Sequence, residues 1–254
     1  MNSRALITLV ALAALGAFAG PTSAEDRARA ALDPAAILRE IEAGNRYSES
    51  YTAILRVASY SPDAAPSLTS YRMYSKGLRK VLMVYLEPAK DAGKKIAMNG
   101  DSYWFYFPRA HQSMLIRPMN TLTGSIAVGD MIGEPVLDLY EFSGSERAGD
   151  AGLRLSFTAK GNSSPYGKIE YEYSGGRIAS QKCYTRSGIL LKIVTFIEYA
   201  QGTGSGYATK ITIRNAIYPG YYSLIQISGL KTADSIPDFW FTPEGLADAG
   251  DRAK

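Results

Sequence analysis

The side chains best suited to catalysis are scarce in this sequence. It has one histidine, His111, and one cysteine, Cys183. A nucleophile–histidine site needs a base with an orienting partner and a shaped pocket, whereas the run PRAHQS around His111 is typical of a loop between two strands. Cys183 lies in a strand-like run, where a free cysteine is commonly a small buried hydrophobe. One histidine and one cysteine are too few ligands for a His/Cys zinc site, and a single cysteine cannot form an intramolecular disulfide. We therefore expect no catalytic residue, no metal and no cofactor.

Two carboxylates in the right arrangement can hydrolyse a glycosidic bond. Glu170 and Glu172 share one face of the run KIEYEYS, while Ile169, Tyr171 and Tyr173 share the other. Strand alternation therefore directs the two glutamates to solvent, and a solvated face is the simpler interpretation. A small hydrolase stays in third place behind two classes of binding protein.

The N-terminus has the pattern of a secretory signal peptide. Arg4 precedes an apolar run over 5–19, and Gly20, Pro21 and the small residues TSA end it. This run is shorter than the roughly 20 residues of a membrane-spanning helix, although an uncleaved anchor is the alternative. We predict an exported protein with a signal peptide over 1–24, a single β domain over 25–246 and a flexible tail over 247–254. Cleavage is expected after about Ala24, and the site has no cysteine for a lipid anchor.

The charge of the chain argues against one class of partner. The formal net charge is +4 at pH 7, and the basic residues are spread along the sequence without a dense run. Nucleic-acid binding domains usually gather Lys and Arg on one face. We expect no nucleic-acid partner.

The pattern of apolar residues predicts a mainly β fold after one N-terminal helix. Asp33 is suited to cap that helix, Pro34 to begin it and Gly44 to end it. The rest alternates with a period of two, and turn sequences such as NGD and SGG separate the runs. We predict about a dozen antiparallel strands. Because one face is apolar, the sheet is expected to be strongly curved around a core or cavity, with short helices covering its concave face. The strands are expected at 51–60, 68–75, 80–86, 96–99, 103–107, 113–117, 153–159, 168–174, 177–185, 190–199, 210–215 and 224–228.

One segment interrupts the strands. From Asn120 to Phe142 the sequence is NTLTGSIAVGDMIGEPVLDLYEF, in which glycines and a proline break any long helix. We expect short helical turns that lie across the sheet, with a second turn over 135–142. The apolar side chains of this proposed lid are Leu122, Ile126, Met131 and Ile132.

The run of five aromatic residues over 103–107 departs from strand alternation, because it places rings on both faces. Tyrosine and tryptophan favour sites with one apolar and one wet end, such as the rim of a lipid-holding cavity, but they equally fill ordinary cores. Trp104 and Tyr106 on one face, or Tyr103, Phe105 and Phe107 on the other, are the alternatives for the cavity side.

The order of motifs over Pro88–Met131 resembles the outer-membrane lipoprotein-sorting protein family of the LolA-like superfamily. The resemblance extends to FWFTPEGL near the C-terminus. Where the family tends to carry an aromatic residue and an acid before its aspartate, this chain has IAVGD. Arg56 is a candidate for the basic residue of the superfamily's cavity. The matching positions are Pro88, Gly93, Asp101, Trp104, Tyr106, Pro108, Arg117, Gly124, Ser125 and Asp130.

The resemblance implies a half-open β-barrel that encloses a hydrophobic cavity for acyl chains. It implies a periplasmic carrier of lipids or lipoproteins, and a possible partner in an inner-membrane transporter, for example of the RND type. The cavity and lid residues would then be Trp104, Tyr106, Leu122, Ile126, Met131 and Ile132. The alternative is a lipid-sensing or accessory module on the same fold that docks on such a transporter or on a regulator.

Overall fold

The structure is a computed structural model, and it describes residues 37, 39, 46–133, 136–149, 152–162, 164–201 and 206–250. The predicted signal peptide, most of the predicted N-terminal helix and residues 251–254 lie outside the described residues. Ile37 and Arg39, which belong to that predicted helix, are both helical. Within the described part of the chain, no helix is long and apolar enough to span a membrane.

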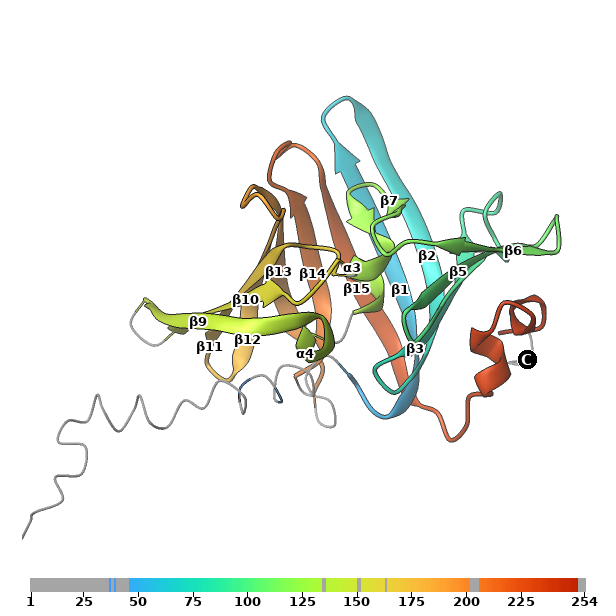
Figure 1. Cartoon of the computed structure of the whole chain (residues 1–254). Coiled ribbons are helices and arrows are strands. Elements are labelled where there is room, and N and C mark those ends of the chain that lie inside the picture. Colours follow the sequence, from blue (N-terminus) through green and yellow to red (C-terminus); the bar gives the residue numbers. More distant parts are fainter. Residues whose placement is uncertain are drawn as a thin grey trace, which may run out of the picture. The chain divides into compact units, whose positions relative to one another are not determined.

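The dominant element is one antiparallel sheet of 13 strands (Figure 1). Its members alternate apolar and polar side chains over most of their length, which is the pattern that buries one face of a sheet. The expected mainly β fold is confirmed. The strands are β1 (Ser50–Ser61), β2 (Ala64–Lys76), β3 (Lys80–Glu87), β4 (Lys95–Asn99), β5 (Ser102–Phe107), β6 (Gln112–Ile116), β9 (Tyr140–Ala148), β10 (Gly152–Ala159), β11 (Lys168–Ser174), β12 (Arg177–Tyr184), β13 (Leu190–Tyr199), β14 (Ala208–Asn215) and β15 (Tyr222–Thr232).

The strand order is that of two meanders joined along a central seam. One meander runs from β6 to β1 and the other from β15 to β9, and β1 pairs with β15 between them. Buried hydroxyls mark the seam, where Ser59 of β1 and Ser223 of β15 lie 2.9 Å apart. Strands β6 and β9 are the two outer strands, so the sheet is open.

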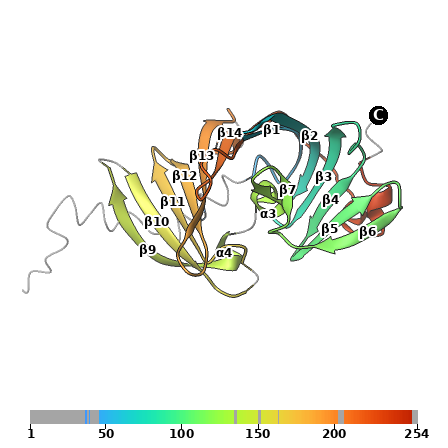
Figure 2. The same cartoon turned by 90° about the horizontal axis from the view of Figure 1, so that it is seen from above.

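The segment between the meanders forms small elements, as expected. β7 (Thr121–Thr123) and β8 (Ile126–Ala127) make a separate two-stranded sheet, and α3 (Val128–Ile132) and α4 (Val136–Leu139) follow. The second helical turn is shorter than the predicted 135–142, because the chain enters β9 at Tyr140. Figure 2 shows α3 and β7 on one face of the sheet.

The first core lies between that face and the segment with α3. Strand β1 contributes Leu55 and Val57 to this core, and α3 contributes Val128. Alternate residues of β2, β3, β4 and β5 extend the core along the sheet. The helix α3 is too short to be stable by itself, so its apolar contacts with the sheet hold it.

A second core lies on the other face of β2–β5. The C-terminal segment folds into two 3₁₀ helices, η1 (Asp238–Phe241) and η2 (Gly245–Ala247), which pack on these strands through Trp240, Phe241 and Leu246. Ala249 is also fully buried in this core, so packing continues past residue 246, where the sequence predicted the domain to end.

The two cores explain the aromatic run over 103–107. Tyr103 and Phe105 face the core shared with α3, whereas Trp104 and Tyr106 face the C-terminal segment. Strand β5 therefore has apolar side chains on both faces because both faces are covered.

Candidate functional site

A cavity of about 170 Å³ lies between the segment with α3 and the sheet. On the sheet side its wall is formed by apolar side chains of β11–β15, and on the other side by α3 and the residues around it. The sheet-side residues include Ile169, Cys183, Val194, Phe196, Ile211, Ile213, Ile225 and Ile227.

Five tyrosines also line the cavity. Tyr51 and Tyr207 pack edge to face, with ring centroids 5.6 Å apart. Burial raises the pKa of Tyr207 well above its usual value, and burial also raises that of Tyr51. Both phenols are therefore neutral at ordinary pH. Their rings extend the apolar wall of the cavity, and their hydroxyl groups add polar atoms to it. The others are Tyr140, Tyr166 and Tyr171.

Of the four predicted lid residues, two line the cavity and two pack in or against the first core. Met131 and Ile132 are buried and line the cavity. Ile126 is fully buried in the first core, and Leu122 is partly buried against that core. These four side chains cover part of the apolar face of the sheet.

Asp130 has three partners, of which Lys192 on β13 connects α3 to the sheet. Its carboxylate lies 2.5 Å from the Lys192 ammonium on β13, and the exposed fractions of the two side chains are only 5% and 12%. It accepts a hydrogen bond from the Tyr166 hydroxyl and another, at 2.7 Å, from the backbone N–H of Ala127 just before the helix. Burial, followed by the charge of Asp130, raises the pKa of Tyr166, so this hydroxyl stays a donor.

Gly124 explains another part of the family motif. It turns the chain between β7 and β8 with φ of +52°, and a Cβ there would lie 2.5 Å from Ser59 Oγ and 3.1 Å from Ser223 Oγ. Only glycine lets the turn approach the seam of the sheet this closely. Ser125 follows in the same turn. Gly124 thus positions the β7–β8 turn against the sheet, and Asp130 positions α3.

The remaining motif positions shape turns on the β3–β6 side. Pro88 and Gly93 belong to the β3–β4 turn, and Gly93 packs against Pro108 of the β5–β6 turn, with 3.7 Å from an ideal Cβ to Pro108 Cγ. Asp101 forms an ion pair of 3.1 Å with Arg79. The backbone N–H of Arg117 donates to the Asn120 side chain at 2.6 Å. These residues support the frame and do not line the cavity.

Three candidate residues lie away from the cavity. Trp104 and Tyr106, predicted as contacts of the lid, pack instead in the second core. The physical reason is that the C-terminal segment covers their face of β5. Arg56, the candidate cavity arginine, is exposed on β1, since its neighbours Leu55 and Val57 take the inward positions. Lys192 does not line the cavity but forms an ion pair with Asp130, which does.

His111 and Cys183, the residues whose types could support nucleophilic catalysis, do not form a nucleophile–histidine site. His111 is exposed in the β5–β6 turn, as its loop-like sequence predicted. Cys183 is buried at the cavity wall, and burial, followed by the charge of Asp130, raises the pKa of its thiol. A thiol in this environment is a poor nucleophile.

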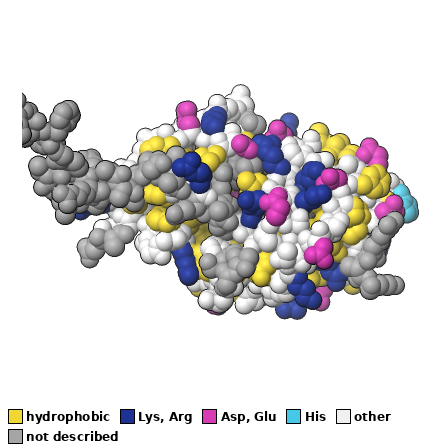
Figure 3. All heavy atoms as spheres, turned by 90° about the horizontal axis from the view of Figure 1, so that it is seen from below, with side chains coloured by type: hydrophobic (Ala, Val, Ile, Leu, Met, Phe, Trp, Pro, Cys, Tyr) yellow, Lys and Arg dark blue, Asp and Glu magenta, His cyan; other side chains and the backbone are white. Residues whose placement is uncertain are grey.

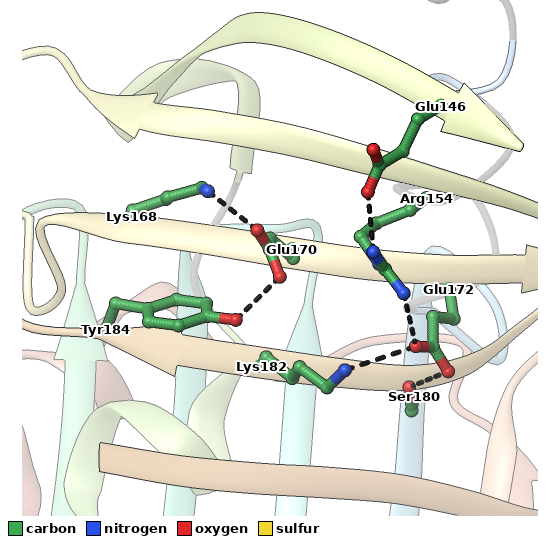
Figure 4. Close-up of polar contacts among 8 residues, drawn as sticks. All are labelled: Glu146, Arg154, Lys168, Glu170, Glu172, Ser180, Lys182 and Tyr184. Atoms are coloured by element: carbon green, nitrogen blue, oxygen red, sulfur yellow. Dashed lines mark hydrogen bonds and ion pairs between the residues drawn. The ribbon is translucent and has the colours of Figure 1, made fainter. Parts of the chain in front are cut away.

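Glu170 and Glu172 belong to a network of ion pairs on β9–β12 (Figure 4). Ser180 and Lys182 hold the pKa of Glu172 below its usual value. Burial alone would raise the pKa of Glu170, but hydrogen bonds from Lys168 and Tyr184 lower it overall. Both carboxylates are paired, so their place on the polar face of the strand fits a solvated surface network.

Charges on the surface are mixed in sign. On the face in Figure 3, Lys and Arg side chains lie among Asp and Glu side chains, with hydrophobic ones between them. Among the described residues, no group of three or more His, Cys, Asp or Glu side chains could hold a metal ion.

Sequence reasoning missed Tyr166 and Lys192. Lys192 lies 62 positions from Asp130 along the chain, and its alternating strand offered no local mark of a buried partner. Asp130 itself was predicted, because it is one of the positions that match the family motif.

The fold is similar to that of several proteins of known structure. A LolA superfamily protein from Nitrosomonas europaea has a similar structure, with a TM-score of 0.74 and 26% sequence identity over 82% of this chain and 96% of that chain. A domain named for outer membrane lipoprotein sorting, from Vibrio parahaemolyticus, gives a TM-score of 0.70 at 18% identity, over 84% and 97% of the two chains. A DUF1329 family protein from Desulfovibrio piger gives 0.70 at 17% identity, over 84% and 98%. The fold is therefore LolA-like.

The sequence comparisons agree with the fold. A family model described as "Uncharacterized protein" matches residues 77–248. A search of curated proteins gave no match. The chain belongs to the outer-membrane lipoprotein-sorting protein family of the LolA-like superfamily, as its motifs predicted.

Proposed function

We propose that this protein is a periplasmic carrier that binds lipid or lipoprotein acyl chains in its apolar cavity and passes them between membrane components. The observation that carries the proposal is the cavity itself, which lies between the sheet and a short segment anchored to it by the Asp130–Lys192 ion pair. Burying acyl chains from water gains roughly 0.8 kcal/mol per CH₂. Such a carrier needs no catalytic step.

The size of the cavity indicates that cargo entry involves movement. A cavity of about 150 Å³ in another protein is known to hold one benzene-sized molecule, and this cavity measures about 170 Å³. It therefore admits a short section of an acyl chain. In the proposed mechanism the sheet is strongly curved, α3 covers its concave face, and α3 moves outward to admit the whole chain. The view in Figure 2, with α3 beside the bend of the sheet, supports this arrangement.

Asp130 determines how easily that movement occurs in this mechanism. Moving α3 away from the sheet separates Asp130 from Lys192 and exposes Met131 and Ile132 to water. Cargo replaces the lost apolar contacts, so opening is favourable when an acyl chain is present and unfavourable without one. Loading and release then follow from the same small displacement.

The test fills the cavity. We expect Val194→Phe to weaken the binding of a fluorescent fatty acid at least tenfold, since a ring from the buried wall of β13 occupies the space. Thr195→Phe is the matched control, because Thr195 is exposed and adjacent on the same strand. Circular dichroism and thermal unfolding check that both variants fold. Equal binding by the wild type and a folded Val194→Phe variant would show that the cavity is not the binding site.

The natural cargo is identified by gentle purification from periplasmic extract followed by mass spectrometry of extracted lipids. The proposal predicts acyl lipids or lipoproteins at near-stoichiometric amounts in the wild type and depletion in Val194→Phe. N-terminal sequencing of the exported protein tests the location, and Glu25 is the expected first residue. The transporter partner, for which the RND type is our proposal, is tested by crosslinking in membranes.

A further inference from the structure

Two neighbouring hairpins end in exposed apolar side chains at the same end of the sheet. The β12–β13 turn carries Ile189, 56% exposed, and the β14–β15 loop carries Ile217, Tyr218 and Tyr221, 50%, 62% and 42% exposed. The two hairpins are joined by a hydrogen bond of 2.9 Å from the N–H of Ala216 to the carbonyl of Leu191. Figure 1 shows them at the top of the molecule. We call Ile189, Ile217, Tyr218 and Tyr221 the tip surface.

Several backbone N–H groups of the β14–β15 loop have hydrogen-bond partners within the loop. The side-chain oxygen of Asn215 accepts the N–H groups of Ile217 and Tyr218, each at 2.9 Å, and the N–H of Tyr221 donates to the carbonyl of Tyr218 at 2.9 Å. Pro219 has no N–H to satisfy. Each N–H group that is already paired lowers the cost of moving the loop into a medium poor in water.

The loop is also held in shape. Gly220 packs so tightly on Pro62 of the β1–β2 turn that a Cβ would lie 2.7 Å from Pro62 Cγ. Just after the loop, the rings of Tyr222 and Tyr60 stack with centroids 4.6 Å apart. Exposed apolar side chains on a fixed loop lose little conformational freedom when they are buried against a partner.

The charges around the tip surface are mainly positive. Arg186 and Arg214 are exposed next to it, and residues 185–197 and 207–222 contain no acidic residue. Arg214 donates to the carbonyl of Pro219 at 3.0 Å and lies over the ring of Tyr222. The β1–β2 turn at the same end adds one exposed acid, Asp63.

We propose that the tip surface docks on an anionic lipid bilayer, with its isoleucine and tyrosine side chains at the boundary between headgroups and acyl chains. Tyrosine favours this depth because its ring is apolar and its hydroxyl polar. Arg186 and Arg214 then lie at the level of anionic headgroups, where each cation adds to the attraction. A protein that docks by strand addition would need a free strand edge, whereas β13, β14 and β15 are paired on both sides. The proposal stands whether or not the cavity binds acyl chains.

The first test reports the surroundings of the tip surface directly. In a Tyr218→Trp variant, we expect the added indole emission to shift to the blue with vesicles of phosphatidylglycerol and phosphatidylcholine, and to shift less with phosphatidylcholine alone. Ile197→Trp is the control, since Ile197 is 46% exposed at the other end of β13. No shift, or an equal shift in the control, would overturn the proposal.

The second test measures partition into the same vesicles by flotation. We expect Ile217→Ser to reduce binding about tenfold, from the lost burial of half an isoleucine side chain, and Ile197→Ser to leave it unchanged. Arg186→Gln should reduce binding to the anionic vesicles about fivefold at low salt and have no effect on neutral ones. Wild-type protein that fails to float with any vesicle would refute docking on lipid and would redirect the tip surface to a protein partner.

Discussion

Neutralising Asp130 tests whether its ion pair with Lys192 holds α3 on the sheet. Asp130→Asn keeps the acceptor for the Ala127 N–H but leaves the Lys192 ammonium almost buried without its counter-charge. Breaking a buried pair from one side costs about 3–5 kcal/mol. Because the Lys192 side chain is 12% exposed, we expect a loss near the lower limit, about 3 kcal/mol of unfolding free energy.

The double variant separates stability from closure of the cavity. Asp130→Asn with Lys192→Met removes both charges, and replacing a buried pair by uncharged groups is often neutral. We expect it to lose at most about 1 kcal/mol of unfolding free energy. It nevertheless lacks the attraction between α3 and β13, so uptake of a fluorescent fatty acid should be about tenfold faster for every 1.4 kcal/mol of lost anchoring.

Two measurements decide the outcome. Urea unfolding of the wild type, both single variants and the double variant gives the coupling free energy of the pair, and stopped-flow fluorescence gives the uptake rate. If the double variant loses as much stability as the two single variants combined, the two charges do not interact. If uptake is equally fast in all four proteins, the pair does not hold α3 closed, and the proposed movement is wrong.

Three other predictions follow from the same contacts. Gly124→Ala should cost at least about 1 kcal/mol more than Gly133→Ala, since both have positive φ but only Gly124 would clash, with Ser59; equal melting temperatures would contradict this. Burial raises the pKa of Tyr85 from 10.0 to about 12, so its contribution to stability is complete below pH 10 and is lost as the pH rises through 12. Tyr85→Phe should therefore lose less stability over that range in urea titrations. Lys95→Met removes hydrogen bonds to the carbonyls of Leu246 and Ala247; hydrogen exchange over 245–250 should accelerate while fatty-acid affinity stays the same, and unchanged exchange would show that Lys95 does not hold this segment.

The sequence predicted most strands because each buries one face. Lys168–Ser174, the clearest alternating run, is β11 with the predicted inward residues Ile169 and Tyr171. Strand β9 was missed, and helix was expected to continue to Phe142. The reason is that β9 is an outer strand whose residues after Tyr140 are mostly exposed on both faces, so packing leaves no alternation in its sequence.

The sequence also predicted the segment that covers the cavity, but not how it is attached. Leu122, Ile126, Met131 and Ile132 were recognisable as apolar residues outside any strand. The choice between the two faces of β5 depended on the C-terminal segment, which reaches β6 through a hydrogen bond from Ser113 to Pro243, 130 positions away. Local pattern carries no information about such distant partners.

The central seam has a consequence for how the chain acquires its fold. Each meander contains only neighbouring hairpins, which form early, but the contact between β1 and β15 joins residues such as Ser59 and Ser223 that are 164 positions apart. Closing so long a loop is slow. A newly made chain should therefore pass through a stage with two formed halves and unpaired edges of β1, which contains Ile54, Leu55 and Val57, and of β15, which contains two isoleucines and two leucines. During that interval the protein is most exposed to aggregation, and pulse-labelling hydrogen exchange during refolding should show last the protection of those β1 and β15 amides that pair across the seam.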